Sequence, residues 1–149
     1  MAISLHSITV MVSKATEHRT GGTTTIRQVM TRTPHTIGSD QSLAQAHKVM
    51  REHGLRHLPV LRGGELVGIL TQRDLYFLES ISGVDVDLDS VADAMSPDVY
   101  SVGPNESLRD VARVMADRKL GCALVIDRGQ VLGIFTVTDA LRHIASAPP

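Results

Sequence analysis

The stretch GILTQRDL at residues 68–75 returns as GIFTVTDA at residues 133–140, 65 positions later. Both copies keep a glycine, an isoleucine, a threonine and an aspartate at equivalent places. This pattern is typical of a strand that runs into a helix, with the threonine at the helix start. A chain that contains the same strand-to-helix connection twice has an internal duplication, and the extent of that duplication decides the fold.

The duplication covers most of the chain, because residues 26–75 align with residues 91–140 at the same offset without a gap. Each copy contains an amphipathic segment, which spans residues 42–54 in the first copy and ends at Gly54, a residue favoured at helix C-termini. Two short apolar runs follow, joined by a glycine turn, and a second helix comes after them. We therefore predict a unit of helix, strand hairpin and helix, preceded by a short apolar turn at Met30 or Met95.

One such unit of about 50 residues has a sheet too small to cover both of its faces, so it would be marginal alone. We therefore predict an α/β (α+β) fold in which two pseudo-symmetric repeats pack through their small β-sheets, with the helices outside. The predicted divisions are a flexible N-terminal arm at 1–24, a first repeat at 25–79, an acidic linker at 80–90, a second repeat at 91–145 and a tail at 146–149.

Composition argues against several classes of protein. The 15 basic and 16 acidic residues nearly balance, whereas a nucleic-acid binder normally has a strongly basic face. No apolar stretch reaches the roughly 20 residues of a membrane helix. The opening residues have neither a basic segment nor a clear cleavage site, so we expect a cytoplasmic protein without a membrane partner.

The sequence offers no catalytic or metal-binding set. Cys122 is the single cysteine and lies in the apolar run GCALVI, so we expect a buried, unreactive thiol. His53 and His57 stand four apart, but Gly54 falls between them and is expected to end the helix. No nucleophile–base set and no phosphate-binding P-loop is recognisable. We therefore expect neither an enzyme nor a metal protein.

The repeated Thr-x-x-Asp has two interpretations. It fits a capping box, in which each side chain bonds a backbone N–H at the helix start. It also fits a nucleotide site, because a helix N-terminus and a threonine hydroxyl suit a phosphate, and a carboxylate can accept from the two adjacent hydroxyls of a ribose. The two roles are compatible, and spacing alone does not choose between them.

The tandem units resemble CBS domains, the cystathionine-β-synthase-type repeats that pair into a Bateman module. The resemblance covers residues 25–145 and rests on the Val-Met turn, on HLPV at 57–60 and on the two Thr-x-x-Asp runs. It implies that an adenosine-containing ligand (AMP, ADP, ATP or S-adenosylmethionine) binds between the repeats as a regulatory ligand rather than as an obligatory cofactor. It also implies that Asp74 and Asp139 bind ribose, and that Thr71 and Thr136 bind phosphate.

The resemblance further implies two mixed clefts, in which one repeat supplies the groups for the base and the other supplies the aspartate for the ribose. One cleft then combines Thr25, Gln28, Met30, Leu55 and Arg56 with Ile134, Thr136, Thr138 and Asp139. The other combines Ser90, Asp93, Met95, Leu120 and Gly121 with Ile69, Thr71, Arg73 and Asp74. Because Asp93 would repel a phosphate, the sequence favours the cleft at Asp139.

The function predicted from these observations is a non-enzymatic regulatory module that senses adenosine compounds. The resemblance implies a homodimer, a disk of four CBS repeats, and an effector protein whose identity the sequence does not reveal. The alternative is a ligand-free scaffold dimer that acts on a partner through its surface.

Overall fold

The computed structural model describes residues 23–147. The predicted arm therefore lies almost wholly outside the described residues, as does the end of the predicted tail. The first repeat contains α1 (Ile26–Val29), β1 (Thr31–Arg32), β2 (Ile37–Gly38), α2 (Leu43–His53), β3 (His57–Arg62), β4 (Glu65–Thr71) and α3 (Gln72–Glu79). The second contains α4 (Val91–Ala94), β5 (Ser101–Val102), α5 (Leu108–Asp117), β6 (Cys122–Asp127), β7 (Gln130–Thr136) and α6 (Val137–Ser146).

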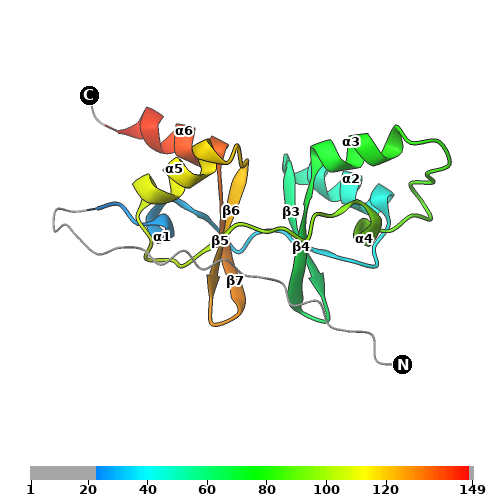
Figure 1. The fold of residues 1–149 in the computed structure, drawn as a ribbon, viewed down its shortest axis with the longest axis horizontal. Helices are drawn as coiled ribbons and strands as arrows, with labels where there is room; N and C mark the ends of the chain where they lie inside the picture. Colours follow the sequence, from blue (N-terminus) through cyan, green and yellow to red (C-terminus); the bar gives the residue numbers. More distant parts are fainter. Residues whose placement is uncertain (1–22, 148–149) are drawn as a thin grey trace.

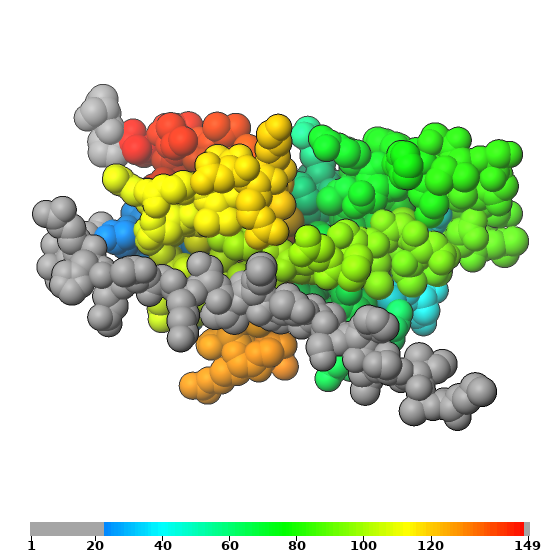
Figure 2. Space-filling view, in the orientation of Figure 1, coloured from blue at the N-terminus to red at the C-terminus, as the bar shows by residue number. Residues whose placement is uncertain are grey.

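The predicted fold class is confirmed. The strand order is β2-β3-β4 in one sheet and β1-β7-β6-β5 in the other. The two hairpins stand side by side at the centre of the molecule, with the helices outside (Figure 1). Ile69 of the first repeat forms a buried apolar cluster with Leu124 and Ile134 of the second, and this cluster joins the sheets. In the space-filling view, α6 in red and α3 in green lie along the same edge (Figure 2).

The first long helix shows how local sequence produces these elements. The hydroxyl of Ser42 accepts a hydrogen bond from the backbone N–H of Gln45 at 3.1 Å, which satisfies one free donor at the start of α2. Gly54 ends the helix with φ 63° and ψ 36°, a left-handed conformation that glycine adopts without strain, as the sequence predicted. Between them, Leu43, Ala46 and Met50 form the buried stripe.

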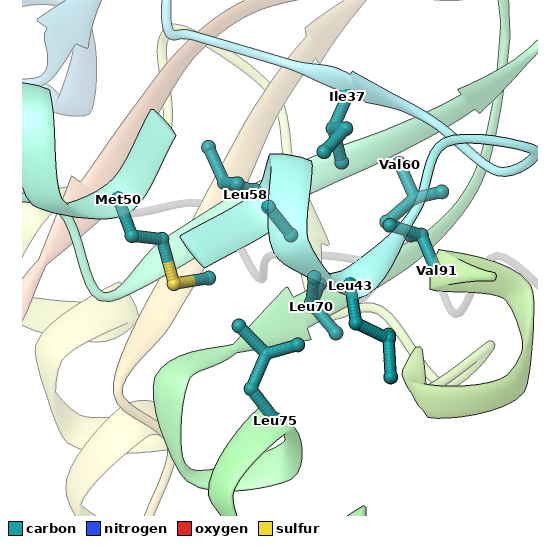
Figure 3. Close-up of a cluster of buried hydrophobic side chains, with 9 residues drawn as sticks. Ile37, Leu43, Met50, Leu58, Val60, Leu70, Leu75 and Val91 are labelled. Carbon is teal, nitrogen blue, oxygen red and sulfur yellow. The ribbon is translucent and has the colours of Figure 1, made fainter. Parts of the chain in front are cut away.

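The opening helix of each repeat packs on the opposite repeat. Ile26 of α1 is completely buried in the core of the second repeat, with Val111 and Phe135. Val91 of α4 is buried in the core of the first, and Figure 3 shows it beside Leu43. Each core is therefore completed by a segment that belongs to the other repeat in sequence.

Backbone hydrogen bonds hold this exchange in a symmetric way. The N–H of Ile26 donates to the carbonyl of Glu106 at 2.9 Å, and the N–H of Val91 donates to the carbonyl of Gln41 at 2.8 Å. These are equivalent positions in the two repeats, so the exchange follows the duplication.

None of the helices in residues 23–147 has the length and apolarity that a bilayer crossing needs.

Two of the repeated glycines are required where the exchanged segments cross the hairpins. A Cβ atom on Gly133 would lie 2.8 Å from the carbonyl oxygen of Thr31 and 2.5 Å from the sulfur of Met30. A Cβ atom on Gly68 would lie 2.7 Å from the carbonyl oxygen of Ser96. A backbone oxygen cannot move aside as a side chain can, so only glycine permits this approach.

We predict that Gly133→Ala lowers the free energy of unfolding by about 1–3 kcal/mol, because the added methyl group overpacks the contact with Thr31. Urea denaturation followed by circular dichroism measures this loss. Gly103→Ala is the matched control, since its Cβ would have no neighbour closer than 3.8 Å. Equal stabilities of the two variants would contradict the role assigned to Gly133.

Candidate functional site

The two Thr-x-x-Asp motifs are capping boxes in this structure. Asp74 Oδ2 accepts hydrogen bonds from the backbone N–H of Thr71 at 3.1 Å and from its hydroxyl at 2.7 Å. Asp139 Oδ2 accepts the same two bonds from Thr136, each at 2.9 Å. In return, each aspartate N–H donates to the threonine hydroxyl, at 3.1 and 3.2 Å. The capping interpretation is therefore correct, but capping uses only one of the two oxygens of each carboxylate.

The exchanged opening segments bring each aspartate to a junction between the repeats. Thr31 pairs with Ile134 across β1 and β7, and its hydroxyl donates to Asp139 Oδ1 at 3.2 Å. In the other half, Ser96 forms an isolated bridge with Ile69, on the strand that leads to Asp74. Each carboxylate thus lies on one repeat, next to a backbone segment contributed by the other.

The structure gathers part of the set predicted around Asp139. Met30 packs against Gly133, one residue before Ile134, and Thr136 caps the same helix as Asp139. The remaining residues of the opening helix lie at its start: Gln28 Oε1 accepts from the N–H of Thr25 at 2.8 Å, and Thr25 bridges to the second repeat. Thr138 is the second residue of α6 and is exposed.

The set predicted around Asp74 is arranged in the same way. Met95 packs against Gly68, next to Ile69, and Thr71 caps α3. Asp93 Oδ2 accepts from the N–H of Ser90 at 3.1 Å and from its hydroxyl at 3.0 Å, so this carboxylate is engaged at the start of α4. Arg73 is the second residue of α3 and is exposed.

The residues that precede the hairpins lie beside the last helix of their own repeat. The carbonyl of Arg56, which follows Leu55, accepts from the N–H of Gln72 at 2.9 Å. The carbonyl of Gly121, which follows Leu120, accepts from the N–H of Val137 at 3.1 Å. Within residues 23–147, no hydrogen bond or ion pair joins Arg56 to Asp139 or Gly121 to Asp74.

The two repeats also meet where His57 faces Gly121. The ring nitrogen Nε2 of His57 lies 2.6 Å from the position that a Cβ atom on Gly121 would occupy. The imidazole therefore occupies the space that the missing side chain leaves, and it links the start of β3 to the start of β6.

Sequence reasoning missed two partners of Asp139. Thr31 bonds its carboxylate, and Arg142 places Nη1 3.5 Å from Oδ1. Both carry a signal that could have been found: a hydroxyl residue follows Met30 and Met95 in both repeats, and Arg142 stands three residues after Asp139 on one helix face. Among residues 23–147, no group of three histidine, cysteine or acidic side chains could hold a metal ion.

The family model of the CBS domain matches residues 26–79 and residues 91–146. The chain belongs to the CBS domain family. The two matches coincide with the two copies of the duplication, so the CBS fold covers nearly all of the described residues.

Comparison with known proteins shows CBS relatives of different sizes. Inosine-5'-monophosphate dehydrogenase of Korarchaeum cryptofilum is 36% identical over 105 residues, which are 70% of this chain but only 21% of that enzyme. The CBS domain-containing protein YhcV of Bacillus subtilis is 29% identical over 114 residues, 76% of this chain and 81% of YhcV. The likeness to the dehydrogenase is therefore confined to a fifth of its length.

Among solved structures, the CBS domain pair of protein MJ0100 has a TM-score of 0.75 with this chain at 26% identity. The match covers 83% of this chain and 97% of that one. MJ0100 was crystallised in complex with 5'-methylthioadenosine and S-adenosyl-L-methionine. A CBS pair of similar fold thus binds adenosine compounds.

His57 at the start of β3 and Cys122 at the start of β6 have shifted pKa values. Burial lowers the pKa of His57 from 6.5, and the neighbouring charge of Arg56 lowers it further, while Asp74 opposes the change. Burial raises the pKa of the Cys122 thiol to about 12, so the thiolate is absent at neutral pH and the thiol is unreactive.

We predict that the free energy of unfolding falls as the pH drops below 6.5, because the unfolded chain then binds a proton at His57 more readily than the folded chain does. Above this pH the ring is neutral in both states and the effect is absent. The loss approaches about 1.4 kcal/mol for each unit by which folding lowers the pKa. Urea denaturation from about pH 7.5 to about pH 5 measures it.

His57→Gln removes this part of the pH dependence, because glutamine does not titrate. His143→Gln, on α6, is the control for the change of a histidine elsewhere. If wild type and His57→Gln lose the same stability on acidification, His57 is not the group responsible.

Proposed function

We propose that this CBS pair is a regulatory module that binds an adenosine-containing ligand (AMP, ADP, ATP or S-adenosylmethionine) between its repeats, at residues 25–79 and 91–145, and signals to an effector protein in the cytoplasm. The observation that carries the proposal is the approach of each opening segment to the aspartate of the other repeat, as between Thr31 and Asp139. The adenosine ligands of the MJ0100 pair support the choice of ligand.

The chemistry of each junction suits the parts of such a ligand. A carboxylate oxygen of Asp74 or Asp139 accepts from the ribose hydroxyls, because adjacent hydroxyls match a carboxylate in geometry. The start of α3 or α6, with its threonine hydroxyl, faces the phosphate or carboxylate end. Met30 or Met95, packed on its glycine, offers a polarisable apolar surface to the adenine ring.

Sensing follows from the exchange of the opening segments. A ligand held between Met30 and Asp139 contacts a segment of the first repeat and a helix of the second. It therefore binds best when that segment and that helix are at the right distance from each other. A conformation with a tighter junction is then favoured in proportion to its higher affinity for the ligand. The effector reads the difference between the two conformations.

We predict that at least one of AMP, ADP, ATP and S-adenosylmethionine raises the melting temperature. A ligand present at 100 times its dissociation constant adds roughly 2.7 kcal/mol to the free energy of unfolding. Differential scanning fluorimetry at millimolar ligand measures the shift, and isothermal titration calorimetry then gives the affinity. If none of the four compounds moves the transition, the ligand-free scaffold becomes the better description.

The double variant Asp74→Asn/Asp139→Asn tests the site. Asparagine keeps an oxygen that accepts from the capping threonine, so the fold persists, but it loses the charge that binds ribose. We expect the ligand-induced shift to disappear. Asp127→Asn, at the exposed end of β6, is the matched control and retains the shift. Unchanged affinity in the double variant would reduce both aspartates to helix caps.

The last helices carry a surface that supports a homodimer, a disk of four CBS repeats. Phe77 on α3 is 70% exposed, and Leu141 and Ile144 on α6 are 60% and 69% exposed. Both helices lie along one edge of the molecule (Figures 1 and 2). Large apolar side chains that remain exposed on these two helices favour an interaction surface there. The scaffold alternative would use the same surface but no ligand.

We predict that the purified chain has twice the mass of 16.1 kDa in light scattering, and that Phe77→Ser/Ile144→Ser has the monomer mass. The serines remove apolar area from the contact without changing the charge. Leu88→Ser, at an 82% exposed position in the linker, is the control and stays dimeric. A dimer that survives the double substitution would place the interface elsewhere.

A further inference from the structure

The two ribose-binding aspartates of the proposed function differ in their second oxygen. Oδ2 of both carboxylates is used in the same way, by the capping threonine. Oδ1 of Asp139 also accepts from the hydroxyl of Thr31 at 3.2 Å and lies 3.5 Å from Nη1 of Arg142. For Asp74, no hydrogen bond or ion pair to Oδ1 occurs within residues 23–147. We call Thr31 and Arg142 the internal partners of Asp139.

The sequence explains why Asp74 lacks such partners. Ser96 is the equivalent of Thr31, but within residues 23–147 its hydroxyl donates no bond to Asp74 and instead accepts from the backbone N–H of Asp98 at 3.3 Å. Phe77 stands at the position equivalent to Arg142 and has no charge. Neither residue binds the carboxylate of Asp74. Asp139 accordingly is only 8% exposed, whereas Asp74 is half-buried.

Positive charge is distributed in the same unequal way. At the start of α3, the backbone carbonyl of Arg56 accepts from the first helical N–H, and Arg73 is the second helical residue. His57 pairs with Thr71 but adds no charge at neutral pH, because burial lowers its pKa. The positions equivalent to Arg56 and Arg73 at the start of α6 hold Gly121 and Thr138, which carry no charge. Arg142 lies further along α6 and is paired with Asp139. Asp93 of the Asp74 set carries an opposing charge, but its Oδ2 accepts from Ser90 at the start of α4. An anionic group therefore meets two arginines at the start of α3 and none at the start of α6.

We infer that the junction at Asp74 is the first to take an adenosine ligand, and that the internal partners Thr31 and Arg142 hold the junction at Asp139 in a self-occupied state. This inference rests on the proposed function, and it reverses the order that the sequence favours. A ribose at Asp139 has to displace the hydroxyl of Thr31 from the oxygen that it needs. At Asp74 the same oxygen is available without displacement.

The displacement also gives the weaker junction a structural consequence. Thr31 lies in β1, the strand of the first repeat that joins the sheet of the second. A ligand that releases its hydroxyl therefore acts directly on the exchanged segment. Filling of the Asp139 junction is linked to the packing between the repeats, and filling of the Asp74 junction leaves β1 undisturbed.

The test is a calorimetric titration of the full chain with AMP, ATP and S-adenosylmethionine, each used separately. We expect two binding events, a tight one at the Asp74 junction and a weaker one at the Asp139 junction. Asp74→Asn should abolish the tight event, and Asp139→Asn should leave it in place. Loss of a hydrogen bond to a charged group changes affinity by roughly tenfold or more. Thr31→Val/Arg142→Gln should therefore tighten the weaker event by about that factor, and should restore one binding event when combined with Asp74→Asn.

Arg113→Gln is the matched control, because Arg113 forms the same (i, i+3) ion pair with Asp110, at 3.0 Å on α5. It should bind as the wild type does, and a melting curve of each variant confirms that it is folded. The inference is overturned if Asp139→Asn abolishes the tight event, or if removal of the internal partners leaves the weaker event unchanged. Absence of binding in wild type and in Thr31→Val/Arg142→Gln alike would instead overturn the proposed function, and the inference with it.

Discussion

The structure depends on the exchange of one short segment between two half-sized repeats. The N–H groups of Ile26 and Val91 donate to carbonyls of the opposite repeat, and their side chains complete its core. A repeat of about 50 residues is expected to be marginal alone, so burial of these side chains couples the folding of one repeat to that of the other. The two repeats are therefore expected to fold as one cooperative unit rather than as two independent domains.

The same exchange creates the candidate site. Each opening segment runs across the hairpin of the other repeat, so its backbone lies within contact distance of Gly133 or Gly68. The residue after the methionine then pairs with a strand of that other repeat. The aspartate that caps the following helix then lies at the boundary between two parts of the chain. A helix cap alone would need no such neighbour. A ligand site does, since a ligand that touches both repeats can report on how they are packed.

The two junctions share a backbone but not an electrostatic environment. Capping by Thr71 and Thr136 is alike to within a few tenths of an ångström, because both are determined by the same helix start. The two junctions differ in single side chains at equivalent positions of the repeats. Arg142 is equivalent to Phe77, and Arg56 is equivalent to Gly121. A duplicated fold can in this way keep its stability while its two sites acquire different affinities, because the charged residues at the rim contribute little to the core.

The sequence by itself determined the duplication, the order of the long helices and hairpin strands in each repeat, and the end of α2 at Gly54, because hydrophobic period and capping chemistry are local. It left capping as one of two interpretations of Thr71 and Thr136, and it did not predict β1, β2 and β5. The resemblance to CBS domains also indicated that the opening turn of one repeat serves the other, as Met30 does beside Gly133. Only the tertiary structure decided that Arg56 and Gly121 lie beside the last helix of their own repeat, and that Thr31 and Arg142 engage Asp139. Thr31 and Asp139 are 108 residues apart in the chain, and no local pattern encodes which atoms meet once two such distant segments pack.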